Sequence, residues 1–140
     1  MKVLYTAEAL ATGDGRDGNA RTTDGKVDVA LSIPREMGGT GAGTNPEQLF
    51  AAGYAACFHS ALRLVGKQAG ANIDDSAVGA KVGIGPNETG GFQLEATLEV
   101  SLPHLSRDEA QDLADRAHQV CPYSNATRGN IDVQVVVAED

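Results

Sequence analysis

Cysteine and aromatic residues are scarce in this sequence. The 140 residues include two cysteines, no tryptophan and 4% aromatic side chains. Two cysteines are too few for the disulfide framework of a small secreted protein, and a reducing cytosol argues against a structural disulfide in a chain of this size. The pair is therefore either two buried thiols or a redox couple, and composition does not choose between them.

Positively charged residues are also fewer than negatively charged ones. The chain has 11 Lys and Arg against 19 Asp and Glu, for a formal net charge of −8. An acidic protein repels phosphate backbones and anionic lipid headgroups. We therefore expect neither a nucleic acid nor a membrane as a partner.

Long apolar runs are missing as well. No run approaches the roughly 20 residues that span a bilayer. The start, MKVLYTAEAL, has a lone Lys2 and no long apolar core before a cleavage-like site, so it does not resemble a signal peptide. These features predict a cytoplasmic protein.

The common metal, nucleotide and hydrolase motifs are absent. There is no CxxC pair, HExxH or GxSxG, and the glycine-rich GGTGAGTN stretch lacks the GK[ST] ending of a phosphate loop. His118 and Cys121 are spaced to share a helical face, whereas Cys57 and His59 are not. We therefore expect no bound metal and no bound cofactor.

The residues that are present fit one domain over 1–140, with 41% hydrophobic content. Alternation of apolar and polar residues and helical spacing predict the elements. The expected strands cover 2–10, 26–33, 78–85, 90–102 and 131–139, the expected helices cover 46–69 and 106–121, and loops cover 13–25 and 38–43. This order predicts an α+β fold with mostly antiparallel sheets and two main helices.

The first helix has the clearest boundaries. Thr44 or Asn45 can cap it, Thr44-x-x-Glu47 has the form of a capping box, and Gly70 marks its end. Its middle has few polar residues on any side, which is typical of a buried helix. A helix of this kind is hard to cover within 140 residues, so we expect a homodimer to bury it.

Two more segments have clear patterns. In the strand over 90–102, the predicted inward residues are Phe92, Leu94, Ala96, Leu98 and Val100. In the second helix, Ser106-x-x-Glu109 forms a capping box, and Pro122 is expected to stop the helix. The apolar residues at helical spacing in that helix are Ala110, Leu113, Ala114, Ala117, Val120 and Cys121.

Cys57 lies in the middle of the first helix and Cys121 at the end of the second. Local composition favours plain packing, because free cysteine is often buried as a small hydrophobe. Reactivity at Cys57 would require a cation to stabilise the thiolate and a carboxylate to orient that cation. Arg16 stands alone in the turn DGRDG, and Glu47 is the favoured carboxylate, although a loop position and a capping role also explain these two residues. The other candidate cations are Arg21, Arg35, Arg63, Arg107, Arg116 and Arg128.

Glu47 raises a question of geometry. It precedes Cys57 by ten residues, or roughly 15 Å on one helix. A glutamate side chain does not span that distance. Either the helix is broken between them, or Glu47 serves this site from a second subunit, which we favour.

Two long segments, TNPEQLFAAGYAACF (44–58) and CPYSNATRGNIDV (121–133), resemble the organic hydroperoxide resistance proteins of the Ohr/OsmC family. The segments TGDGRDG and PREMGGTGAGTNPEQ fit the same pattern in the same order, so the resemblance covers essentially the whole chain. The glycine stretch before Thr44 is shorter than in the family. The resemblance implies an OsmC-like fold and an intertwined homodimer.

The resemblance also implies a mechanism. Cys57 matches the peroxidatic cysteine, Cys121 the resolving cysteine that forms a disulfide with it, Arg16 the thiolate-stabilising arginine and Glu47 the carboxylate that holds this arginine. The substrate would be an organic hydroperoxide. The reductant would be an external dithiol, a dihydrolipoyl group on a lipoylated protein.

The apolar surroundings of Cys57 favour an organic peroxide over hydrogen peroxide. Phe50, Tyr54 and Phe58 are the expected pocket residues. Two alternatives stay open: an OsmC-type peroxidase with a broader peroxide range, and a dimeric binding protein for small apolar ligands whose cysteines only pack.

Overall fold

The computed structural model describes residues 1–139 and divides into two compact units, Met1–Leu49 and a second that begins at Phe50. Each is described here by itself. The expectation of one domain over 1–140 stays a prediction.

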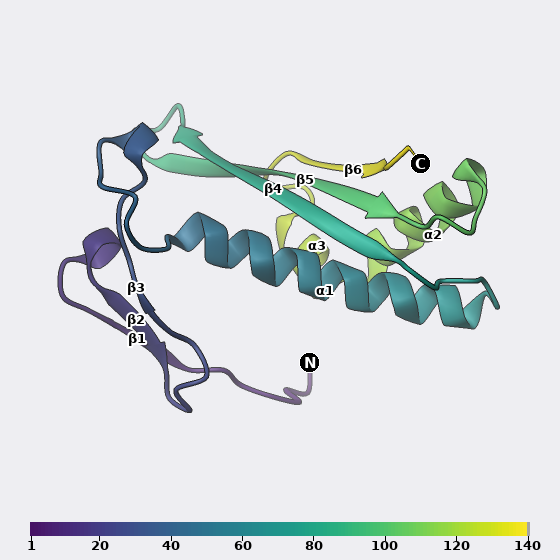
Figure 1. Cartoon of the computed structure of the whole chain (residues 1–140), viewed down its shortest axis with the longest axis horizontal. Coiled ribbons are helices and arrows are strands. Elements are labelled where there is room, and N and C mark those ends of the chain that lie inside the picture. The colour runs from purple at the N-terminus through teal and green to yellow at the C-terminus, as the bar shows by residue number, and fades with distance from the viewer. Residues whose placement is uncertain (140) are drawn as a thin grey trace. The chain divides into compact units, whose positions relative to one another are not determined.

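The first unit contains a small antiparallel sheet in the order β1-β2-β3 (Figure 1). The bounds are β1 Ala9–Thr12, η1 Gly15–Asp17, β2 Asn19–Thr22, β3 Asp28–Ala30 and η2 Arg35–Met37. The predicted strand over 2–10 is therefore wrong for most of its length, because β2 offers partners only as far as Ala9. The predicted strand over 26–33 is also too long, and β2 lies inside the predicted loop over 13–25.

Helix α1 spans Pro46–Gln68 without interruption, which confirms the prediction for 46–69. Its cap is Asn45, whose Oδ1 accepts a hydrogen bond of 2.8 Å from the N–H of Gln48. The predicted Thr44–Glu47 capping box is wrong, because the Thr44 hydroxyl instead donates to Gln48. Gly70, at φ +67°, follows the helix in the left-handed conformation that ends many helices.

The second unit contains a three-stranded sheet in the order β4-β5-β6. Strands β4 (Ala77–Pro86) and β5 (Phe92–Ser101) pair antiparallel over ten residues, and β6 (Val133–Val137) lies parallel to β5 (Figure 1). The crossover between them contains α2 (Arg107–Val120) and α3 (Pro122–Thr127). The predicted α+β class is confirmed, and so is the Ser106–Glu109 capping box.

The core of the second unit packs α1 and α2 against β5. The predicted inward residues Ala96, Leu98 and Val100 are buried, but Phe92 is 70% exposed. Phe92 pairs with Pro86 at the hairpin end of the sheet, outside this core. Val120, which the helical spacing grouped with the core, is also exposed.

Helix α1 is only partly covered within this chain. Tyr54, Phe58 and Leu62 are fully buried, whereas Leu64 is 48% exposed. By length and composition alone, α1 is also a candidate membrane span, a test that the core helix of a globular domain passes equally well. The homodimer expected from the apolar sequence of this helix stays a prediction.

Candidate active site

The two cysteines lie together in the second unit. Cys57 is in the middle of α1, and Cys121 occupies the corner between α2 and α3, where its N–H still donates to Ala117. Pro122 has no N–H, so it ends α2 and takes the first position of α3. The Cys121 thiol donates to the Cys57 sulfur at 3.6 Å, and both cysteines are free. Two segments 64 residues apart thus bring two thiols into contact.

The environment of Cys57 opposes ionisation of its thiol. Burial raises the pKa of Cys57, and the neighbouring Cys121 raises it further, while a hydrogen bond from the backbone of Tyr123 lowers it. A thiol with a raised pKa is a poor nucleophile at neutral pH. Reactivity at Cys57 therefore requires a further positive group.

Three aromatic rings, two from α1 and one from α3, pack against one another near Cys57. Phe50, Tyr54 and Tyr123 have ring centroids 5.6 to 5.9 Å apart. Gly53 makes room for the Tyr123 ring, since a Cβ at this position would lie 2.9 Å from the Tyr123 hydroxyl. A glycine in mid-helix, which helix propensity disfavours, is explained by this close approach.

A buried hydrogen-bond network lies in the same region, and the sequence analysis did not find it. The Tyr54 hydroxyl lies 2.9 Å from Ser124 Oγ and 3.1 Å from Thr127 Oγ1. Ser124 Oγ is also 2.8 Å from Nδ1 of His118. The network depends on α3, for which the sequence analysis predicted no element; the proline directly after Cys121 was a possible signal for a new helix.

Arg16 and Glu47 form a bidentate ion pair within the first unit. The two guanidinium nitrogens donate to the two carboxylate oxygens at 2.8 and 2.7 Å. The hydrogen bonds to Arg16 lower the pKa of Glu47, and those to Glu47 raise the pKa of Arg16. Both groups are charged at neutral pH, and Glu47 fixes the direction of the guanidinium.

The continuity of α1 and the ion pair bear on the two explanations for how Glu47 could serve the site of Cys57. Because α1 is continuous from Pro46 to Gln68, a break between Glu47 and Cys57 is excluded. The Glu47 carboxylate pairs with Arg16 of its own chain, so any site that Glu47 serves also receives Arg16.

Among the three predicted pocket residues, Phe50 lines an open cavity. Phe50 borders a cavity of about 470 Å³ between α3 and the β4–β5 hairpin, together with Phe92, Leu94, Thr127 and Ile131. Tyr54 and Phe58 have no exposed surface and belong to the core. The lining of this cavity combines apolar side chains with the amides of Asn87, Gln93 and Asn130.

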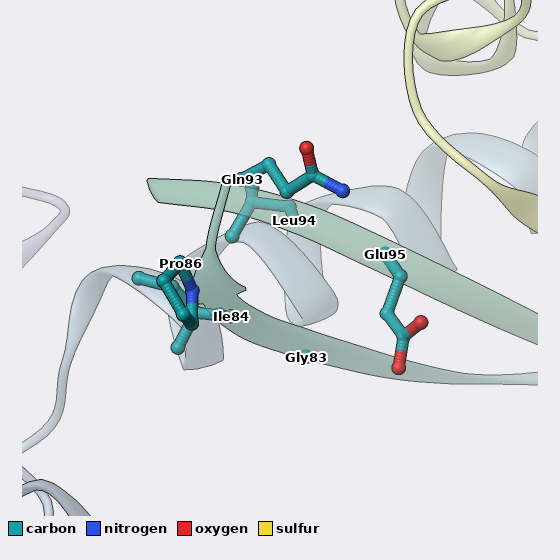
Figure 2. Close-up of a pocket in the computed structure, with 7 residues that line it drawn as sticks. Gly83, Ile84, Pro86, Gln93, Leu94 and Glu95 are labelled. Atoms are coloured by element: carbon teal, nitrogen blue, oxygen red, sulfur yellow. The ribbon is translucent and has the colours of Figure 1, made fainter. Parts of the chain in front are cut away.

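A second hollow, of about 230 Å³, lies over the β4–β5 ladder (Figure 2). Figure 2 shows the Glu95 carboxylate beside Gly83, with Gln93, Leu94, Ile84 and Pro86 around the hairpin. The residues that line the hollow include no cysteine, histidine or basic side chain, so it offers neither a thiol nor a cation to stabilise one.

Within residues 1–139, no three His, Cys, Asp or Glu side chains cluster in a way that could hold a metal ion. His59 Nε2 lies 2.9 Å from the Ser76 hydroxyl, and His118 faces Ser124. Cys57 and Cys121 themselves supply two free thiols.

Comparison with known proteins shows the family of this chain. Residues 39–136 match the sequence model described as OsmC-like protein. The chain belongs to the OsmC-like family. It is 53% identical over 139 residues to the organic hydroperoxide resistance protein of Xanthomonas axonopodis pv. citri, covering 98% of this chain and 96% of that protein. It is 45% identical over 132 residues to OhrB of Bacillus subtilis, covering 94% of this chain and 96% of OhrB.

Solved structures agree. The crystal structure of an organic hydroperoxide resistance protein OsmC from Legionella pneumophila matches with a TM-score of 0.94 and 47% identity, covering 99% of this chain and 100% of that one. The resemblance inferred from the sequence and the OsmC-like fold are therefore confirmed.

Proposed function

We propose that this OsmC-family protein is a cysteine-based, thiol-dependent peroxidase that reduces alkyl and lipid hydroperoxides to alcohols and protects the cell from organic hydroperoxide stress. The observation that carries the proposal is the contact of two free thiols, Cys57 and Cys121, at 3.6 Å. The names of relatives at 45–53% identity support the substrate class.

In the first step, the Cys57 thiolate attacks the terminal oxygen of the hydroperoxide. An S–O bond forms, the O–O bond breaks, and the alkoxide leaves as the alcohol after taking up a proton. Cys57 becomes a sulfenic acid. The fixed, charged Arg16 guanidinium is the group we assign to stabilise the thiolate and the developing negative charge, with Glu47 as its orienting partner.

In the second step, the Cys121 sulfur attacks the Cys57 sulfenic acid. An S–S bond forms, the S–O bond breaks, and water leaves. A dithiol then reduces the Cys57–Cys121 disulfide by exchange, and a dihydrolipoyl group on a lipoylated protein is the donor we propose. No bound cofactor is needed in this cycle.

We assign the hydrocarbon part of the substrate to the apolar side of the cavity beside Phe50, where Phe92, Leu94 and Ile131 favour an organic peroxide over hydrogen peroxide. The protein is proposed to act in the cytoplasm as a homodimer, in which Arg16 and Glu47 of one subunit serve Cys57 of the other. This arrangement satisfies both the unbroken α1 and the ion pair within one chain.

Single-turnover oxidation of matched serine variants tests the mechanism. Cys57→Ser is expected to abolish dihydrolipoamide-dependent reduction of cumene hydroperoxide. Cys121→Ser is expected to be oxidised once, to yield one alcohol, and then to stop. Mass spectrometry and alcohol yield report both outcomes, and full turnover by Cys57→Ser would overturn the proposal.

Two further measurements separate the alternatives. Similar rates with hydrogen peroxide and cumene hydroperoxide would indicate a broad-range OsmC-type peroxidase. Slow thiol labelling and no sulfenic acid after sub-stoichiometric peroxide would indicate a binding protein whose cysteines only pack.

A further inference from the structure

The hydroxyl network beside the two cysteines has a defined direction. Thr127 Oγ1 contacts the backbone carbonyls of Tyr123 and Ser124 at 3.0 and 3.2 Å, and a carbonyl only accepts. The single hydrogen of Thr127 is therefore used there, and Thr127 must accept from Tyr54. The Tyr54 hydroxyl is then the donor in its 3.1 Å contact with Thr127.

The same counting fixes the remaining two bonds. With its own hydrogen used, the Tyr54 oxygen accepts from Ser124 Oγ at 2.9 Å. Ser124 in turn accepts from Nδ1–H of His118 at 2.8 Å. The chain runs His118 to Ser124 to Tyr54 to Thr127 without a break or a reversal, and every member is satisfied.

This chain joins the two segments that hold the cysteines. Tyr54 precedes Cys57 by three residues on α1, and Ser124 follows Cys121 by three residues at the start of α3. Tyr54 and Cys57, three residues apart, share a face of α1, and Cys121 is the N-cap residue of the helix that contains Ser124. The Tyr54–Ser124 hydrogen bond and the Cys57–Cys121 contact are thus neighbouring links between α1 and the α2–α3 corner.

We propose that Tyr54 is a positioning residue for disulfide formation, whose hydroxyl holds α3, and with it Cys121, against Cys57. The sulfur atoms must close from 3.6 Å to a covalent bond of about 2.0 Å. Fixing Ser124 and Thr127 to Tyr54 limits the motion left to Cys121. The inference deepens the proposed function and rests on it for its role in the catalytic cycle.

The direct test measures the effective concentration of the two thiols in glutathione redox buffers. Tyr54→Phe keeps the ring in the core and removes only the central hydroxyl. It is expected to lower the effective concentration about tenfold, the effect of losing one buried hydrogen bond. Tyr5→Phe, the same change at an exposed tyrosine, is the matched control and is expected to behave as wild type.

Two variants break the chain elsewhere. Ser124→Ala removes the next link, and Thr127→Val removes the last acceptor with almost no change of shape; both are expected to lower the effective concentration as Tyr54→Phe does. Either decides the question if Tyr54→Phe does not fold. Wild-type values in the folded variants would overturn the inference.

The equilibrium needs no hydroperoxide, so it separates the two proposals. A wild type that forms the disulfide in glutathione buffer but does not reduce cumene hydroperoxide would overturn the proposed function alone. In an active enzyme, Tyr54→Phe is expected to form Cys57 sulfenic acid at the wild-type rate and the disulfide about tenfold more slowly. A second hydroperoxide would then convert more Cys57 to sulfinic acid, visible by mass spectrometry; disulfide formation at the wild-type rate would contradict the role of Tyr54.

Discussion

At the scale of single residues, the oppositely charged side chains of Arg16 and Glu47 behave as one group. Arg16 and Glu47 share two hydrogen bonds, and the Glu47 side chain retains only 13% of its exposed surface. The lowered pKa of Glu47 has a consequence for stability. The unfolded chain binds a proton at Glu47 more readily than the folded chain does. The free energy of unfolding therefore rises with pH between the lowered pKa of the folded state and the ordinary Glu pKa.

Glu47→Gln is expected to destabilise the protein by about 1 kcal/mol or less at pH 7, since the pair is partly open to solvent. The loss of unfolding free energy relative to wild type should be complete above the ordinary Glu pKa of 4.5. It should vanish as the pH falls through the lowered pKa that Glu47 has in the folded protein. Urea unfolding at several pH values measures it. A difference that grows toward low pH would contradict the assignment.

At the scale of elements, the start of α1 is set by the hydrogen bonds of its first turn. Asn45 caps the helix, while Glu47 is engaged by Arg16 and does not close a capping box. The same three-residue spacing does form a full capping box at Ser106 and Glu109. Whether a Thr-x-x-Glu pattern becomes a box thus depends on what else the glutamate meets.

Asn45→Ala is expected to cost about 1 kcal/mol of unfolding free energy, because it leaves the N–H of Gln48 without its acceptor. Thr44→Ala is the control and should cost clearly less, since the Thr44 hydroxyl bonds only the exposed Gln48 side chain. Chemical denaturation of both variants gives the comparison. Equal losses would restore Thr44 as a capping residue.

At the scale of the whole molecule, α1 leaves apolar surface such as Leu64 uncovered within one chain. We proposed that a second subunit covers it and contributes the Arg16–Glu47 pair. In that proposal, each site takes its ion pair from one subunit and its thiols from the other. It can therefore be tested by mixing chains that are inactivated at different residues.

Cys57→Ser and Arg16→Ala chains should each be inactive or nearly so. After unfolding and refolding them together, half of the dimers are mixed, and each mixed dimer has one intact site, for about one quarter of wild-type activity. Peroxidase assays with light scattering measure activity and mass together. No recovery in mixed dimers of confirmed mass would mean that the pair serves Cys57 of its own chain.

Several features were predictable from the sequence alone because they depend on local chemistry or on long motifs. The bounds of α1, the Ser106 cap and the β4–β5 strands follow from caps and periodicity. The needs of a reactive thiol made Arg16 and Glu47 candidates, but their roles and those of Cys57 and Cys121 came from the resemblance to the family, since composition favoured plain packing for the cysteines.

Only the tertiary structure decided which of these groups meet. It placed two thiols at 3.6 Å, paired Arg16 with Glu47, and buried Tyr54 and Phe58 where a pocket was expected. It also formed α3 and the hydroxyl chain through Tyr54, which join residues about 70 positions apart. Local patterns specify a helix or a strand, but contacts between distant side chains exist only after those elements pack.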